Sequence, residues 1–462
     1  MITSNSHLPH TAIDLPDGIA VPGLYALLDT REMLARINEQ LPAGMKPFDR
    51  CRISTLRFKT LANCLVGYTL SQDDPQSPEA VVMNLYARGF PMEAFGPASA
   101  KAQADRWAAS DAGPSVTVLP EVGAILYWYP NDERLAGLRR IVDRKKLQRA
   151  FHAHLPAYPQ EEWRVSDRSI RLRLVRYKPE RRAVLSCRFR AHRREGEHHE
   201  ERVVYLGVYE PVRLAEIWRT HNELYACARE TREWTVPQPM GLLPDDCVAV
   251  SEARSGEPLL VTLDKGRPDE ARQATALAAA AIAAFHRQKL TSLPVVGPED
   301  LRTMISETTG MLCQVDSAHR ELWEDTGQRL RSAADRTRSD RGLLVHGDLH
   351  PGQILLGEGV PALLDFDRSH QGDPVMDLGN FAAQLWVNWS QAGNGGLDVD
   401  DLTNGFIEAY SRAAESEVDR SLLRWWTAFA LFRSALVPMG RFAYDWRHRA
   451  VATVEQACTH LA

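Results

Sequence analysis

The stretch from 343 to 380 combines two aspartates, a histidine and an amide at a spacing that could carry out chemistry. An apolar segment leads into His346 and Asp348, and a later apolar segment ends at Asp365. Gln353 follows five residues after the first aspartate. Phosphoryl transfer needs a group that orients the attacking hydroxyl and divalent cations that neutralise the charge on the phosphoryl group. Carboxylate and amide oxygens suit Mg²⁺, so the spacing predicts a base beside a metal site.

Short strands and long helices must position these side chains. Apolar runs between turn residues predict strands at 342–345, 354–356 and 362–364. Helices are expected on both sides of these strands, at 274–288, over 300–338 as one long helix or as two that divide at Gly310, and over 375–460. The chain after about 268 is therefore predicted to be helical around the catalytic loop.

The chain before 268 contains β-type segments in two similar sets. Residues 56–60 (LRFKT) and 175–179 (VRYKP) match at an offset of 119, and two further apolar strands follow each of them. A helical stretch comes next in both sets, at Ala98–Ala109 and at Val212–Arg229, before a Leu-Pro pair and another apolar strand. Any two units of this type share apolar spacing, but the common order and the Arg-aromatic-Lys pair favour an internal duplication.

The stretch from 343 to 380 resembles the catalytic core of the aminoglycoside phosphotransferase and choline kinase family, small-molecule relatives of the protein kinases. The family pattern is H-G-D-x-x-x-x-N, followed by a strand that ends in an aspartate. The resemblance implies that Asp348 is the catalytic base and that His346 braces the catalytic loop. It also implies that Gln353 and Asp365 hold Mg²⁺.

The resemblance covers about 170–450, strongly at 343–380 and thinly elsewhere, and together with the internal duplication it predicts the fold. In the segment 372–379, Asp373 is expected to cap a helix whose first residue is Pro374. The implied fold is of the α+β class: a protein kinase-like bilobal fold with a duplicated β-rich N-terminal lobe and a helical C-terminal lobe. The expected parts are an extended arm (to about 22) and a helix capped at Asp29 or Thr30 (together 1–47), a degenerate repeat of the N-lobe (48–155), the kinase-like N-lobe (156–262) and the helical C-lobe with the catalytic loop (263–462). The first repeat lacks a catalytic loop of its own, so we expect it to serve as a brace, an oligomerisation surface or a substrate wall.

Two positions depart from the family pattern. Gln353 stands where asparagine is expected, and its amide lies one methylene further from the backbone. The third strand of the β-rich lobe, 203–209, has Gly207 where the family has a lysine that contacts the nucleotide phosphates. A metal held by Gln353 would therefore be shifted or bound through water, and the phosphates need another cation.

The preceding hairpin offers replacements for the missing lysine. Lys178 and Arg176 are the predicted nucleotide-binding cations, with Glu223 or Glu216 on the following helix as the acidic partner. The turn 179–182 holds arginines where a phosphate-covering loop would hold glycines, so phosphate contacts there are expected to come from side-chain charge.

These features together predict a kinase that uses ATP, or another nucleoside triphosphate, and Mg²⁺. Its acceptor is expected to be a hydroxyl of a small molecule: a sugar, an aminoglycoside or an amino alcohol. The alternative is a pseudokinase that binds a ligand or partner without turnover, which the missing lysine favours. A protein kinase is a weaker third hypothesis, because the chain has DFD in place of DFG and no APE follows.

The composition limits which binding partners and which cellular compartment are expected. A net charge of −5 over 462 residues provides no field that gathers phosphate backbones, so no nucleic-acid partner is expected. No apolar run approaches the ~20 residues that span a bilayer, and the N-terminus has no signal-peptide pattern. Seven scattered cysteines, none in a CxxC pair, predict reduced thiols and a cytoplasmic location. The expected partner is the small-molecule acceptor, and any homo-oligomer is expected to form through the first repeat.

Overall fold

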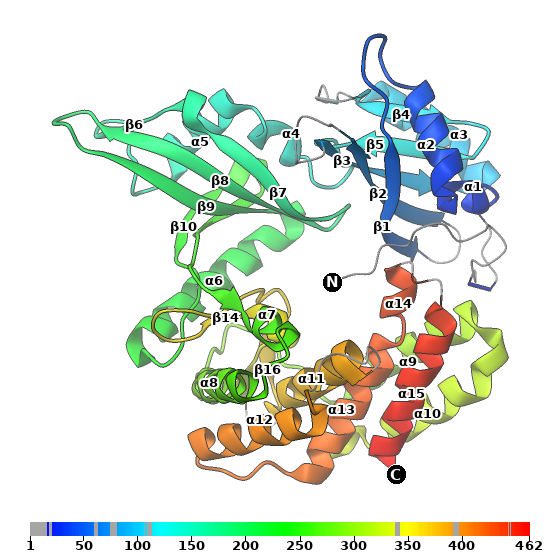
Figure 1. Cartoon of the computed structure of the whole chain (residues 1–462), viewed down its shortest axis with the longest axis vertical. Coiled ribbons are helices and arrows are strands. Elements are labelled where there is room, and N and C mark those ends of the chain that lie inside the picture. Colours follow the sequence, from blue (N-terminus) through cyan, green and yellow to red (C-terminus); the bar gives the residue numbers. More distant parts are fainter. Residues whose placement is uncertain are drawn as a thin grey trace. The chain divides into compact units, whose positions relative to one another are not determined.

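The computed structural model describes residues 16–17, 21–59, 63–73, 81–105, 107–108, 113–337, 342–390, 397–441, 443 and 445–462. They form two compact units, which we call the β unit and the helical unit (Figure 1). The β unit comprises Met1–Leu214, Gly241–Val250 and Val437–Arg447, and the helical unit comprises Ala215–Met240, Ser251–Leu436 and His448–Ala462. Of the predicted N-terminal arm, residues 1–15 and 18–20 lie outside the described residues. The four-part division stays a prediction.

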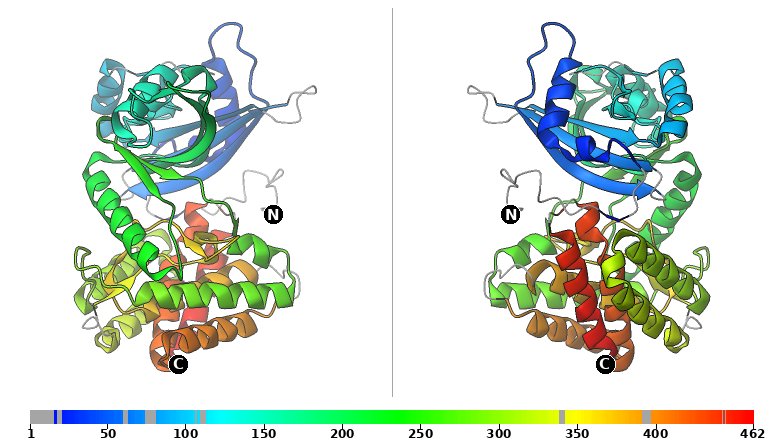
Figure 2. Two further views of the ribbon diagram at one scale, coloured as in Figure 1. Left: turned by 90° about the vertical axis from the view of Figure 1, so that its left-hand side faces the viewer. Right: turned by 90° about the vertical axis from the view of Figure 1, so that its right-hand side faces the viewer.

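The first sheet of the β unit is antiparallel, with the strand order β1-β2-β3-β5-β4. Its elements are β1 (Arg50–Lys59), β2 (Asn63–Gln72), β3 (Val81–Gly89), α3 (Met92–Ala104), β4 (Val116–Leu119) and β5 (Ala124–Trp128). Helices α1 (Leu24–Leu28) and α2 (Thr30–Glu39) lie on one face of this sheet (Figure 2). The Asp29 carboxylate accepts the N–H groups of Arg31 and Glu32 and caps α2, as predicted. Buried Met33 and Ile37 of α2 join the core on this face.

The second sheet repeats the topology of the first. It contains β6 (Trp163–Val165), β7 (Arg171–Lys178), β8 (Arg182–Arg193), β9 (His199–Tyr209), β10 (Pro239–Leu243) and β11 (Val248–Glu252). Its strand order is β10-β11-β9-β8-β6, with β7 also paired to β8, and α6 (Pro211–Thr231) joins β9 to β10 as α3 joins β3 to β4. Both β1 and β7 have a register shift against the strand that follows. This shared order agrees with a duplication, which stays a prediction.

The helix of the first repeat lies earlier in the chain than predicted. The prediction placed it at Ala98–Ala109, but α3 runs from Met92 to Ala104. Pro97 lies inside α3, where a proline is unusual because it has no N–H to donate to the helix. Phe95, in the first turns of α3, packs against the core on the second face of the sheet, and this tertiary contact favours the earlier start.

The helical unit surrounds three short strand pairings. Its helices include α7 (Leu259–Asp264), α8 (Pro268–His286), α9 (Pro298–Val315), α10 (Arg320–Ser332), α11 (Val375–Leu385), α12 (Val399–Ala414), α13 (Arg420–Ser434) and α15 (Trp446–Leu461). Three further helices belong to the β unit: α4 (Leu138–Ile141), α5 (Arg144–His154) and α14 (Val437–Gly440). Helices α8 and α12 lie side by side (Figure 2). The break in the predicted 300–338 helix falls at Asp316 and not at Gly310.

Short strands in the helical unit carry the predicted site. β13 (Leu343–Val345) pairs with β16 (His370–Gly372), while β14 (Ile354–Leu356) pairs with β12 (Glu257–Pro258) and with β15 (Ala362–Leu363). These strands confirm the pattern predicted around the catalytic loop, and the α+β class is confirmed. None of the described helices is long and apolar enough to cross a membrane.

Candidate active site

The backbone of the catalytic loop is held by a buried aspartate from α11. The N–H of His346 donates to Asp377 Oδ2 at 2.6 Å, and the N–H of Gly347 donates to Asp377 Oδ1 at 2.9 Å. Gly347 has a φ of +78°, and a Cβ there would lie 2.4 Å from the carbonyl oxygen of Arg368. Only glycine fits this turn without strain. The tight turn at Gly347 and the hydrogen bonds to the Asp377 carboxylate therefore together fix the course of the catalytic loop.

The Asp377 carboxylate belongs to a buried chain of hydrogen bonds. His286 at the end of α8 places Nε2 3.0 Å from Asp377 Oδ2, and its Nδ1 lies 2.9 Å from the Tyr410 hydroxyl of α12. Burial alone would raise the pKa of Asp377, but the His286 hydrogen bond, the nearby His346 ring and the His346 N–H hold the pKa below its ordinary value. The carboxylate therefore stays ionised and keeps accepting from the catalytic loop.

The His346 ring connects two parts of the candidate site through hydrogen bonds. Its fully buried ring donates from Nε2 to the carbonyl oxygen of Leu364 at 2.8 Å, which leaves Nδ1 to accept from the N–H of Asp348 at 3.4 Å. The ring thus links the residue before Asp365 to the backbone of the proposed base. This geometry fits the bracing role implied by the resemblance.

Asp348 is accessible and has cationic neighbours. Its side chain is 47% exposed, and Arg368 Nη1 lies 3.9 Å from its Oδ1. Burial lowers the pKa of Arg433 on α13, the Arg368 guanidinium lowers it further, and the Asp348 carboxylate opposes both. The accessible Asp348 carboxylate therefore lies in the electrostatic field of two guanidinium groups, those of Arg368 and Arg433.

The two predicted metal ligands lie together. Gln353 is buried, and its Nε2 donates to Asp365 Oδ2 at 3.1 Å. Asp365 has a φ of +65°, a left-handed conformation that is uncommon outside glycine and concentrates at functional sites. No group of three or more His, Cys, Asp or Glu side chains in the described part of the chain is arranged for a metal. One carboxylate and one amide still fit Mg²⁺, which keeps several waters and takes few protein ligands.

The two predicted nucleotide-binding cations share one face of the second sheet. In the strand register, Arg176 pairs with Val184, which pairs with Gly207 on β9. Lys178 pairs with Arg182, which pairs with Tyr209. Directly paired residues of an antiparallel sheet point to the same face. Both predicted cations therefore point to the face that carries Gly207, from β7, two strands away along the sheet.

Arg182 is a further cation on this face. Its guanidinium lies over the Tyr209 ring, 5.2 Å from the ring centroid. The same ring covers Gly207, since a Cβ at Gly207 would lie 2.8 Å from Tyr209 Cε2. A side chain at Gly207 would require the Tyr209 ring to move, and Arg182 supplies a positive charge on the neighbouring strand. It is one of the two arginines of the turn 179–182, for which side-chain phosphate contacts were expected.

The predicted acidic partners lie on α6. Glu223 accepts a hydrogen bond from the Ser292 hydroxyl within the helical unit, and Glu216 lies two turns earlier on the same helix. Asp373 behaves almost as predicted, because its carboxylate accepts the N–H of Val375, where α11 begins one residue later than expected. Asp377 was missed as a functional residue, although the GDP…DLG segment that contains it formed part of the resemblance.

Comparison with known proteins supports the resemblance. Residues 214–426 match the model of the phosphotransferase enzyme family. A hydroxyurea phosphotransferase from Kitasatospora aureofaciens is 32% identical over 226 residues, which cover 45% of this chain and 59% of that protein, so the match spans less than two thirds of its length.

Solved structures of kinases show weaker similarity. A choline kinase from Cryptosporidium parvum Iowa II is 12% identical, with a TM-score of 0.47 over 69% of this chain and 95% of that chain. A choline/ethanolamine kinase family protein from Mesorhizobium loti is 16% identical, with a TM-score of 0.44 over 69% and 94% of the two chains. The segment that matches the family model contains the catalytic loop, in agreement with the resemblance that its motif indicated.

Proposed function

We propose that this protein is a kinase that transfers a phosphoryl group from ATP, or another nucleoside triphosphate, to a hydroxyl of a small molecule. One observation carries the proposal. An accessible Asp348 follows a strand whose loop is fixed by Asp377, and the Gln353–Asp365 pair lies at the end of the next strands in the same unit. A base, a metal-binding pair and a rigid loop are the parts that phosphoryl transfer requires.

Each residue has a defined task in the proposed reaction. Asp348 orients the acceptor hydroxyl and accepts its proton as the oxygen bonds to the transferred phosphorus, while the bond from that phosphorus to the nucleoside diphosphate breaks and the diphosphate leaves. Gln353 and Asp365 would hold Mg²⁺ after the Gln353 amide rotates to present its oxygen, and Mg²⁺ would neutralise charge on the phosphates. His346 and Asp377 keep the loop in place through the contacts described above.

The nucleotide is proposed to use the cationic face of the second sheet. Arg182, Lys178 and Arg176 provide positive charge where the family lysine is absent. The pseudokinase alternative rests on that same absence, because Tyr209 fills the space beside Gly207. Arg182 favours the catalytic proposal, since a guanidinium forms strong charge-assisted hydrogen bonds with phosphate oxygens.

The surroundings of Asp348 narrow the acceptor class. Arg368 lies 3.9 Å from the carboxylate, and Arg433 interacts electrostatically with both groups. A polycationic aminoglycoside would face two like charges there, which opposes binding. We therefore propose a neutral or anionic acceptor, and the relative named for hydroxyurea is consistent with a small neutral one.

A phosphate-transfer assay that compares the Asp348→Asn variant with the wild type tests this proposed function. ADP release would be measured with ATP and Mg²⁺ against hydroxyurea, sugars, amino alcohols and aminoglycosides. We expect a loss of about 10²–10⁴-fold in kcat for Asp348→Asn, the range for a general base. Glu358→Gln makes the same chemical change in an exposed turn ten residues on and should leave kcat unchanged. Full activity of Asp348→Asn would refute the assigned base, and a wild type that binds ATP without transfer would support the pseudokinase alternative.

A further inference from the structure

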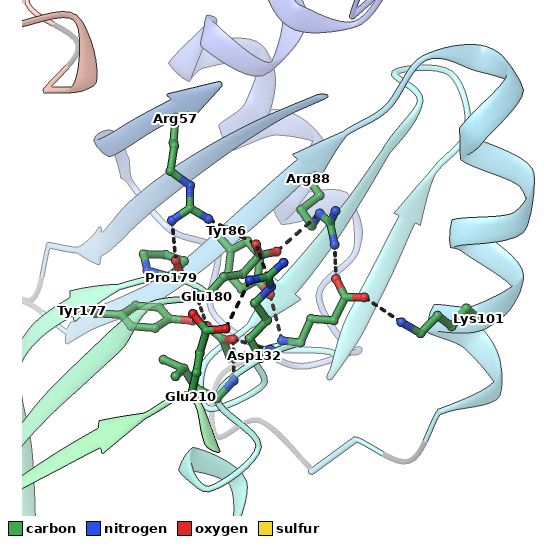
Figure 3. A network of polar contacts seen from close by, with 12 residues as sticks. Arg57, Tyr86, Arg88, Lys101, Asp132, Tyr177, Pro179, Glu180 and Glu210 are labelled. Carbon is green, nitrogen blue, oxygen red and sulfur yellow. Dashed lines mark hydrogen bonds and ion pairs between the residues drawn. The ribbon is translucent and has the colours of Figure 1, made fainter. Parts of the chain in front are cut away.

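The first sheet and the β7–β8 turn are joined by a buried network of charged side chains (Figure 3). We propose that the first sheet is a positioning unit for this turn, and that Asp132 and Glu180 hold it so that Lys178 and Arg182 can meet the nucleotide phosphates. The inference rests on the proposed function and assigns a task to the N-terminal repeat.

Asp132 connects the two sheets through its carboxylate. Oδ1 accepts the N–H groups of Arg134 and Leu135 at 2.8 and 2.9 Å, which fixes the aspartate in its own loop. Oδ2 accepts the Tyr177 hydroxyl at 2.8 Å and the Glu180 N–H at 2.9 Å (Figure 3). A fully buried carboxylate with four donors therefore fastens both the last residues of β7 and the turn itself.

Glu180 fastens the turn from the opposite direction. Its side chain is buried and lies among three arginines of the N-terminal repeat, with its oxygens 3.2 Å from Arg57, 3.4 Å from Arg88 and 3.9 Å from Arg134. Arg57 also donates to the carbonyl oxygen of Pro179 at 3.3 Å. Glu180 has a φ of +60°, a conformation that a non-glycine residue keeps only when surrounding contacts impose it.

Apolar packing supports the same attachment. The Tyr177 ring packs against the core on the second face of the first sheet, which includes Leu65, Tyr86 and Ile125. It also meets the Tyr129 ring edge-on, with centroids 6.0 Å apart. Ring and hydroxyl of Tyr177 are thus both held by the N-terminal repeat.

The main chain of this turn has few donors left for a ligand. A glycine-rich loop binds phosphates through its N–H groups. Here the N–H of Glu180 donates to Asp132, and the N–H of Arg181 donates to the carbonyl oxygen of Lys178 at 3.0 Å. Phosphate binding by the turn must therefore come from side chains, whose positions depend on how firmly the turn is held.

Nucleotide affinity of full-length variants tests the inference. Tyr177→Phe removes one donor to Asp132 and keeps the ring, while Glu180→Gln removes the charge among the arginines. We expect both to raise the KM for ATP and the Kd of a non-hydrolysable ATP analogue about 3–10-fold, with kcat within twofold. Glu121→Gln breaks the Arg36–Glu121 ion pair on the same repeat, away from the turn, and should change neither constant.

A double-mutant cycle shows whether the network acts through Arg182. If Tyr177 positions that cation, Tyr177→Phe should raise the KM for ATP much less in an Arg182→Gln background. Variants that melt earlier yet keep the wild-type KM, or fully additive effects in the cycle, would overturn the inference while leaving the kinase proposal intact. A wild type that binds no nucleotide would overturn both.

Discussion

Two buried aspartates in this protein hold two different loops. Asp377 in the helical unit accepts the N–H groups of His346 and Gly347, and Asp132 in the β unit accepts the Glu180 N–H and the Tyr177 hydroxyl. In both cases the carboxylate is more than 25 residues away in the sequence from the loop it holds. Both loops are held by the same kind of contact, but one loop carries the proposed base and the other carries the cations proposed to bind the nucleotide.

The two carboxylates differ in their electrostatic surroundings. Burial opposes ionisation of both, but the His286 hydrogen bond and the His346 ring bring the pKa of Asp377 below its ordinary value. Burial of Asp132 outweighs its neutral donors and raises its pKa, and the nearby Glu180 carboxylate also has a pKa raised by burial. Buried carboxylates that hold loops can therefore have pKa shifts of opposite direction, depending on whether histidine rings or neutral donors surround them.

Substitution of Asp377 should have the largest effect. Asp377→Asn leaves the loop N–H groups and His286 without an ionised acceptor, and breaking a buried charged network costs about 3–5 kcal/mol. A displaced catalytic loop should also lower kcat by about 10²-fold. Urea unfolding and steady-state kinetics measure the two effects. Asp400→Asn, on the exposed start of α12, should change the unfolding free energy by less than about 0.5 kcal/mol. Unchanged unfolding free energy and kcat in Asp377→Asn would contradict the assigned role of Asp377 in holding the catalytic loop.

Substitution of Asp132 should have a smaller effect of another kind. Asp132→Asn keeps the size but turns one acceptor atom into a donor that faces N–H or O–H groups, a mismatch worth about 1–3 kcal/mol in unfolding free energy. The KM for ATP should rise while kcat changes little, because the loop of Asp348 is untouched. The same unfolding and kinetic assays measure this. A fall in kcat with an unchanged KM for ATP would contradict the assigned task.

The smallest expected difference between Asp377 and Asp132 is in how each affects the pH dependence of the unfolding free energy. The lowered pKa of Asp377 contributes stability that is present above the unfolded value of about 3.9 and is lost as the pH falls through the folded pKa. The raised pKa of Asp132 contributes stability that is present below the unfolded value and is lost as the pH rises through the folded pKa. Asp377→Asn should therefore flatten the acid loss of stability, and Asp132→Asn should steepen it. Urea unfolding between pH 3 and 7 measures both slopes, and equal slopes in the two variants would contradict the opposite signs.

Local sequence patterns predicted the parts of the site that are close in the chain. Apolar runs located the short strands, and the motif identified the Gln353–Asp365 pair, which the structure brings to 3.1 Å. Asp377 could not be assigned, because its role depends on how α11 packs beneath a loop about 30 residues earlier. The turn arginines were expected to contact phosphates, but the placement of Arg182 over Tyr209 follows from strand register, and the Arg57–Glu180 pair joins residues 123 apart. Neither register nor the packing of two sheets is encoded in local periodicity.

The most direct test of this account is a side-by-side comparison of Asp377→Asn and Tyr177→Phe in one phosphate-transfer assay. We predict that Asp377→Asn lowers kcat by about 10²-fold with a nearly unchanged KM for ATP. Tyr177→Phe should raise the KM for ATP with a nearly unchanged kcat. If both substitutions changed the same kinetic constant, the two anchors would not serve separate tasks and the account would be wrong.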